Sequence, residues 1–264
     1  ILFIILFLLI SCSLEENSTN KNITQAIPKS SDLIIKFHDI NQISQKIKNY
    51  KWWKELRSTT FIRENLHILD ILNQRFNINE IFQNKTIYVS SMLVGDDKHD
   101  FLITTSISDI QTKSNQLMRM VNSSDNNQKI YEGVQINNIK FNTENFGNQN
   151  IFFAIQNNIF ILSFSEMIIQ ESIRQINTKT DLFKIEPIYK LDKNLPKYSD
   201  LNILVKTKFL EKKIGQQNIF INSDTWSWFD VELENNNILL NGVTNRGNIK
   251  YLIDNQYSDS KKSN

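Results

Sequence analysis

One short segment occurs twice in the chain. Pro28-Lys29-Ser30-Ser31-Asp32-Leu33-Ile34-Ile35 returns as Pro196-Lys197-Tyr198-Ser199-Asp200-Leu201-Asn202-Ile203, at an offset of 168 positions. In both copies a proline-led turn precedes a strand-like and then a helix-like pattern. The sequence therefore predicts two related units, the second shorter than the first. Chance similarity is the alternative.

Hydrophobic periodicity predicts the elements of these units. Apolar residues alternate over 32–38, which is typical of a half-buried strand. We expect a helix after Asp39, with Gln42 completing a capping box, and a second-unit helix capped by Thr207. Further helices are predicted over 52–76, 110–121 and 165–176, and strands near 86–94, 101–108, 129–136, 139–141, 151–155, 159–164, 226–233 and 238–244.

These patterns predict an α+β fold, with antiparallel sheets, helices packed on one face, and two tandem repeats of which the second is shortened. We expect five regions. They are a truncated signal peptide (1–11), a lipidated cysteine with a flexible tether (12–26), the first repeat (27–186), the shortened second repeat (187–257) and a polar tail (258–264).

The first ten residues are uniformly apolar, and the chain turns polar after Ser11-Cys12-Ser13. A membrane-spanning helix needs ~20 apolar residues, whereas the apolar core of a signal peptide has roughly 7–15. This segment is therefore predicted to be a signal-peptide core. Because no initiator Met or basic residues precede it, we expect the sequence to start inside the signal.

Leu9-Ile10-Ser11-Cys12 resembles the lipobox of bacterial lipoproteins. The resemblance implies signal cleavage after Ser11, diacylglycerol on the sulfur of Cys12, and a lipid-anchored location in the cell envelope, at the outer membrane on its periplasmic or surface side. Several acyl chains anchor a protein stably, since each buried methylene contributes ~0.8 kcal/mol. The alternatives are a fortuitous cysteine near a signal and a buried N-terminal strand.

Loose motifs across 27–243 resemble a family of bacterial lipoproteins whose shared region is known only as a domain of unknown function. They are the strand opening at Pro28, Trp52-Trp53-x-x-Leu56, the Ser90–Phe101 hairpin, Ile161-Leu162-Ser163-Phe164-Ser165, and Trp226-Ser227-Trp228-Phe229-Asp230-Val231 before Leu240-Asn241-Gly242. The resemblance implies an envelope location and tandem α+β repeats. It brings no catalytic residues.

Composition limits the chemistry that we expect. A single cysteine excludes an internal disulfide and a thiolate-rich metal site. The net charge is only +2, without a basic stripe, so we expect no nucleic-acid partner. We find no nucleophile elbow, zinc-hydrolase helix or phosphate-binding glycine pattern. Accordingly we predict no catalytic residues, no metal, no cofactor and no enzymatic activity.

Three features of the sequence are candidate sites. The Gly95–Asp100 turn gathers carboxylates and His99, but it lacks calcium-loop spacing, so we expect a solvated hairpin turn. His67 lies among apolar residues of a predicted helix and is expected to pack there. The tryptophans Trp52, Trp53, Trp226 and Trp228 are candidates for a ligand platform, with packing in the core as the favoured alternative.

The sequence therefore predicts a lipid-anchored binding or scaffolding protein of the cell envelope. Its expected partners are membrane lipid, through acylated Cys12, and an unidentified envelope protein or glycan. Two other classes stay open. One is an envelope hydrolase acting on glycan or peptide, which needs paired carboxylates across a cleft. The other is a surface adhesin that binds glycan or peptide through the tryptophans.

Replacing Cys12 by Ala tests the anchor. We expect Cys12→Ala to remove acyl labelling and to move the full-length protein out of the membrane fraction, because the sulfur is the predicted attachment point. Ser13→Ala, at the next position, is the control and should keep both. An unchanged membrane fraction for Cys12→Ala would refute the lipid anchor.

Overall fold

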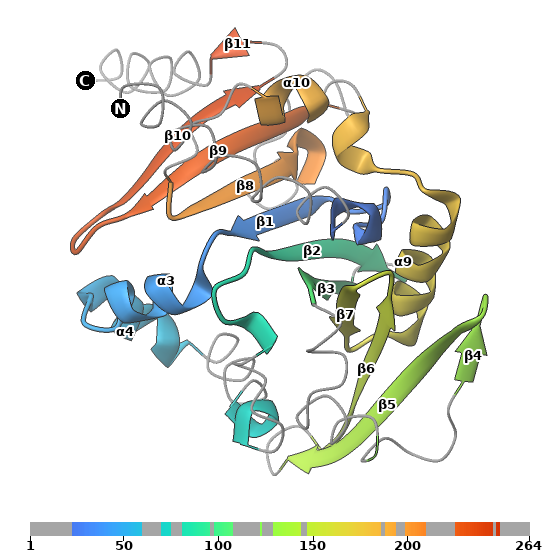
Figure 1. Cartoon of the computed structure of the whole chain (residues 1–264). Helices are drawn as coiled ribbons and strands as arrows, with labels where there is room; N and C mark the ends of the chain where they lie inside the picture. Colours follow the sequence, from blue (N-terminus) through green and yellow to red (C-terminus); the bar gives the residue numbers. More distant parts are fainter. Residues whose placement is uncertain are drawn as a thin grey trace, which may run out of the picture.

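The computed structural model describes residues 23–59, 70–74, 81–95, 98–107, 122, 129–143, 147–185, 188–193, 199–209, 225–244 and 247–248. Its centre is one antiparallel sheet with the strand order β11-β10-β9-β8-β1-β2-β3-β7-β6-β5-β4 (Figure 1). A mixed fold with antiparallel pairing was predicted and is confirmed. The expected separate sheets are wrong, because one ladder of strand pairs joins both halves of the chain.

The strands are β1 (Leu33–Phe37), β2 (Ile87–Val94), β3 (Lys98–Ser106), β4 (Lys129–Tyr131), β5 (Val134–Thr143), β6 (Gly147–Gln156), β7 (Ile159–Ser163), β8 (Leu201–Lys206), β9 (Trp226–Leu233), β10 (Ile238–Thr244) and β11 (Gly247–Asn248). The named helices are η1 (Thr24–Ala26), α3 (Ile40–Ile47), α4 (Lys51–Ser58), α9 (Glu166–Thr178), η2 (Leu182–Lys184) and α10 (Ile188–Lys193). In the described ranges, no helix is both long and apolar enough to cross a bilayer.

Helix α3 begins where the sequence predicts it. The side chain of Asp39 accepts hydrogen bonds from the backbone N–H groups of Asn41 (2.9 Å) and Gln42 (3.1 Å). Capping of this kind satisfies donors that a helix start otherwise leaves open. Ile43 and Ile47, one turn apart, are buried against the sheet. The cap and the apolar stripe together position α3 over one face of the strands.

Both faces of the sheet are covered, so the expectation of helices on one face is wrong. Adjacent residues of β7 point to opposite faces, and both are buried. Phe160 packs with Leu72, Ile81 and Phe82, whereas Ile161 packs with α9 and with Ala26 of η1. The same holds at the β8–β9 end, where α3 covers one face and η1, η2 and α10 cover the other. Burial on both sides explains the continuous apolar run of β7, IFILS.

Other predicted elements differ in detail. The segment 129–136, expected as one strand, is broken by a turn at Glu132 and Gly133, both with positive φ (46° and 81°). Such φ values suit a tight hairpin, and β4 and β5 pair across the turn. Strand β3 begins at Lys98, so His99 and Asp100 belong to a strand and not to the turn. The predicted helix over 110–121 lies outside the described residues.

The two proline-led segments lead into neighbouring central strands. Strands β1 and β8 pair antiparallel, with Leu33 opposite Val205, Ile35 opposite Ile203 and Phe37 opposite Leu201. Backbone contacts continue past the strand end, since the Lys206 N–H donates to the Asp32 carbonyl (2.8 Å). This pairing is the only strand contact between the β2–β7 side of the described sheet and the β9–β11 side.

Two isoleucines provide a matched test of the core. Ile161 on β7 is fully buried, whereas Ile130 on β4 is 73% exposed. We expect Ile161→Ala to lower the free energy of unfolding by about 2–5 kcal/mol, through lost burial and a residual cavity. Ile130→Ala should change it by less than about 0.5 kcal/mol. Urea unfolding measures both values, and equal values would contradict the described burial.

Candidate functional site

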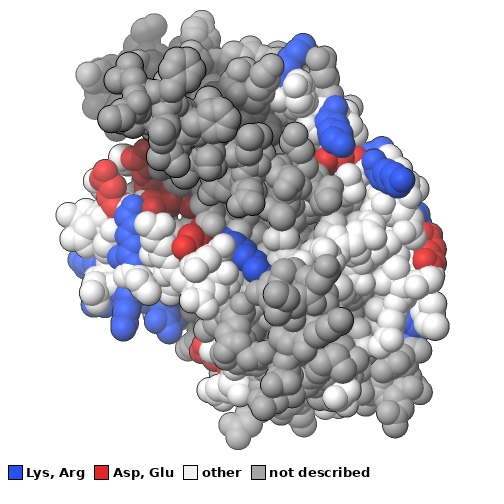
Figure 2. All heavy atoms as spheres, viewed as in Figure 1, with Lys and Arg blue, Asp and Glu red and all other residues white. Residues whose placement is uncertain are grey.

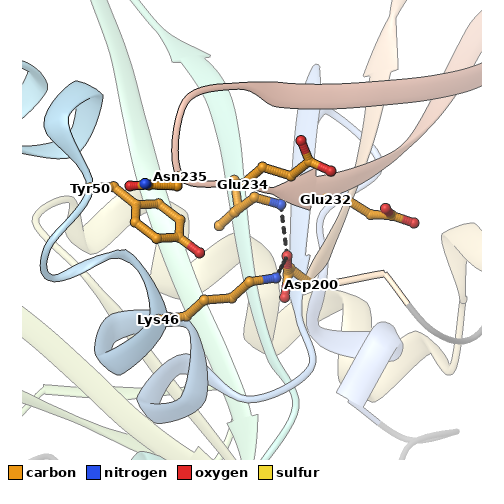
Figure 3. A pocket seen from close by; sticks show the side chains of 7 residues that line it. Lys46, Tyr50, Asp200, Glu232, Glu234 and Asn235 are labelled. Carbon is orange, nitrogen blue, oxygen red and sulfur yellow. Dashed lines mark hydrogen bonds and ion pairs between the residues drawn. The ribbon is translucent and has the colours of Figure 1, made fainter.

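One concavity of the described chain lies between the end of α3 and the β9–β10 hairpin. It has a volume of about 530 Å³. Figure 3 shows Lys46, Tyr50 and Asp200 facing one another, whereas the carboxylates of Glu232 and Glu234 point away from Lys46 at the rim. The lining residues are Lys46, Tyr50, Asp200, Glu232, Leu233, Glu234 and Asn235. We call this concavity the acidic recess.

Asp200 holds the recess together. Its Oδ2 accepts from the Lys46 ammonium at 2.6 Å and from the Leu233 backbone N–H at 2.7 Å. These contacts connect α3, the residue before β8, and β9. Hydrogen bonds to an ionised group are stronger than neutral ones, although partial exposure of the Lys46–Asp200 ion pair limits its contribution to stability. Asp200 therefore fixes the shape of the recess.

The recess carries an excess of negative charge. Three carboxylates, from Asp200, Glu232 and Glu234, line it against one ammonium, from Lys46. Both glutamate side chains are exposed. In Figure 2 the largest group of Asp and Glu atoms lies at the left, beside Lys and Arg side chains, and smaller groups lie elsewhere on this face. A concave surface of one sign raises the local concentration of opposite charges. The recess therefore favours a cationic ligand.

The walls of the recess differ in chemistry. The carboxylates come from the β8–β9 side, whereas α3 and its end contribute Lys46 and Tyr50 to the other wall (Figure 3). Hydrolysis of a glycosidic bond needs two carboxyl groups on opposite sides of the scissile bond. These lining residues do not provide an opposed pair, because Lys46 and Tyr50 occupy the facing wall.

A polar network lies close by, under the central strands. The Asn202 amide is its centre, with Oδ1 2.8 Å from Nε2 of His38. Its Nδ2 donates to Ser199 Oγ (2.7 Å) and to Asp230 Oδ1 (2.6 Å). The hydrogen bonds of His38 and Ser199 thus run through Asn202. The network therefore joins β1, β8 and β9 through polar side chains.

Burial shifts both titratable groups of the network. It lowers the pKa of His38, with the positive charge of Lys36 adding to the effect and the Asn202 contact and Asp230 opposing it. Burial also raises the pKa of Asp230, against the stabilising hydrogen bond from Asn202. In each case the charged form loses solvation.

The four candidate tryptophans divide into two pairs. Trp226 and Trp228 are buried (6% and 2% exposed) on one face of β9, where Trp228 packs edge-on against Phe183 at 6.3 Å. Their ring faces are not available to a ligand. Trp52 and Trp53 are half-buried against the cluster under α3. The ring N–H of Trp52 donates to the Glu234 carbonyl (2.9 Å), so Trp52 supports the hairpin beside the recess.

Other predicted site residues are placed as follows. Ser11, Cys12 and His67 lie outside the described residues. His99 is on β3, with its ring 5.1 Å from that of Phe209. No group of three or more His, Cys, Asp or Glu side chains able to hold a metal ion occurs in the part of the chain that the structure describes.

Sequence reasoning did not single out the recess. Asp200 was part of the repeated segment, but nothing there marked it as the partner of Lys46, 154 positions away. The one local signal was Glu232-x-Glu234 beside the Asn turn, which places two carboxylates on the same face of a strand end. Comparison of the chain with protein-family models, curated proteins and solved structures found no match.

The His38 network predicts how stability depends on pH. Unfolded His38 takes up a proton near its ordinary pKa of 6.5, whereas the folded state resists protonation. The unfolded state then binds more protons, so the free energy of unfolding should fall as pH decreases from about 7.5 to 5.5. Asp230, whose pKa is raised, acts with the opposite sign nearer its ordinary value of 3.8.

Urea unfolding across this pH range measures the effect. His38→Gln should remove the part of the decrease in the free energy of unfolding that His38 causes. His99→Gln is the matched control, and this variant should retain the same decrease. An identical pH dependence in the parent chain and His38→Gln would show that His38 does not contribute.

Proposed function

We propose that the protein is a lipid-anchored binding or scaffolding module of the cell envelope, without an enzymatic activity of its own. Cys12, after a short apolar segment, supplies the anchor. The acidic recess supplies the binding site, and its excess of carboxylates carries this proposal. The partner that fits it is a basic segment of an envelope protein, presenting Lys or Arg side chains.

Three properties of the recess support a cationic partner. Glu232 and Glu234 are exposed at the rim, and their negative charge attracts an ammonium or guanidinium group there, although their carboxylates point away from Lys46 (Figure 3). Tyr50 lies in the same recess, and an aromatic ring attracts cations over its face. Lys46 is held by Asp200, so its charge is partly neutralised. The carboxylates on one wall favour binding over hydrolysis, because they do not flank a scissile bond.

We also infer that the fold arose by duplication of a strand–helix–hairpin unit. The offset of 168 positions maps Ile35 onto Ile203, and these two residues pair directly with each other. The copies therefore meet around a local two-fold axis. The strand order β3-β2-β1-β8-β9-β10 follows the same symmetry, because each unit places its first strand at the centre.

Two further contacts support the duplication. The Asp32 N–H donates to Ser91 of β2, and the Asp200 N–H donates to Val231 of β9 in the same relative place. Helices are also exchanged between the units. α3, which follows β1, packs on β8 and β9, and Phe209, in the helical segment after β8, packs on His99 of β3.

Binding of a tetralysine peptide tests the recess. We expect measurable binding by calorimetry at low salt, weakened by added salt because the contacts are exposed. The double variant Glu232→Gln/Glu234→Gln should bind about threefold to tenfold more weakly, since exposed charge pairs contribute about 0.2–1 kcal/mol each.

Asp70→Asn, which removes an exposed carboxylate that does not line the recess, is the control and should bind as the parent chain does. Tetraglutamate should not bind. Equal affinities in the parent chain and the double variant would refute the recess as the binding site.

A further inference from the structure

In the part of the chain that the structure describes, the outer edge of β10 is open along most of its length. β10 pairs with β9 from Ile238 to Thr244, but β11 covers only Val243 and Thr244. Among the residues that the structure describes, no strand pairs with this edge over Ile238–Gly242. Three consecutive apolar side chains on that stretch are exposed, namely Ile238 (44%), Leu239 (40%) and Leu240 (54%).

An open strand edge is a template for another strand. Proteins usually protect such edges with charged residues, proline, bulges or very short strands. The sequence of β10, ILLNGVT, contains neither charge nor proline. The opposite end of the sheet is different, because β4 has only three residues and its Lys129 forms an ion pair with Glu166. Of the two edges of the described sheet, the β10 edge is thus the unprotected one.

The duplicated unit indicates what this edge accepts, and this step rests on the duplication proposed above. The counterpart of β10 in the first unit is β3. The outer edge of β3 is filled by β7, which pairs antiparallel from Leu102–Ser163 to Ser106–Ile159. β7 has the sequence IFILS and all five residues are buried. The counterpart edge therefore takes an uncharged, apolar, antiparallel strand.

We propose that β10 pairs with β10 of a second copy of this chain. β10 is itself an uncharged and apolar strand, already extended, with the same open edge, so two copies complement each other around a two-fold axis. β4 of a second copy fits less well, because it has only three residues and its Lys129 is charged and ion-paired with Glu166.

The pairing extends the sheet across two molecules. A five-residue ladder is small compared with the interface of a stable dimer, so the association in solution is weak. Confinement of both copies on one membrane raises their effective concentration and favours it. Exposed Ile238, Leu239 and Leu240 lose contact with water in the pair, which provides its hydrophobic stabilisation.

Cysteine crosslinking tests the pairing directly. The chain has one cysteine, so Cys12→Ala leaves a background without thiols. Because this change also removes the proposed anchor, the purified protein is used at high concentration, where a weak association in solution is populated. Single cysteines at positions 238, 239, 240 and 241 of the full chain are oxidised with copper phenanthroline. Disulfide-linked dimers are expected. The dimer yield should be highest at one or two of these positions, because only residues near a two-fold axis lie beside the same residue of the second copy.

Ile130→Cys, on the exposed β4 edge, is the control for random collision and should give several-fold less dimer. Adding Leu240→Lys to the Ile238→Cys chain places a charge at the interface and should abolish crosslinking there. Dimer yields no higher than that of Ile130→Cys would overturn the proposal. The proposal would also be overturned if, in cells, the β10 cysteines crosslinked to a different protein and formed no dimer of this chain. Neither result would affect tetralysine binding, which tests the recess independently.

Discussion

The backbone pairing of β1 with β8 is the interaction on which the rest of the structure depends. These strands are 168 positions apart, yet they are neighbours at the centre of the sheet. Closing so long a loop costs conformational entropy, although this cost rises only slowly with loop length. Burial of apolar side chains on both faces of the sheet offsets this cost. Ile34 and Leu204 belong to the cluster on one face, and Ile203 packs against the cluster on the other. Without this pairing, the two sides of the described sheet would share no strand contact.

The acidic recess is a consequence of the same pairing. α3 follows β1, whereas Asp200 precedes β8, so the antiparallel register brings Lys46 to Asp200 across the junction. Trp52 then supports the β9–β10 hairpin through the Glu234 carbonyl. The buried Asn202 network adds a polar connection between β1, β8 and β9. The proposed binding site thus lies where the strands on either side of the β1–β8 pairing meet.

Local signals in the sequence predicted local structure well. Alternation and capping located β1 and α3, and the Asn turn located β9 and β10 with their observed ends. The sequence did not predict that both faces of the sheet are covered, because a continuous apolar run such as IFILS does not indicate which elements pack on each face. The turn at Glu132-Gly133 was missed because its flanks continue the same apolar pattern. The recess required the register between distant strands, which no local pattern of Lys46 or Asp200 contains.

Hydrogen exchange of backbone amides tests the central role of the β1–β8 pairing most directly. Antiparallel pairs alternate between bonded and non-bonded, so Ile34 and Leu204, two residues on from the Lys206–Asp32 bond, donate across this ladder. If the ladder holds the two sides together, the amides of Ile34 and Leu204 should exchange only through global unfolding, as slowly as those of β7. The fully buried β7 strand provides the internal reference within the same experiment. Fast exchange along β1 and β8, with β7 still protected, would show that the two sides open independently and would contradict the account.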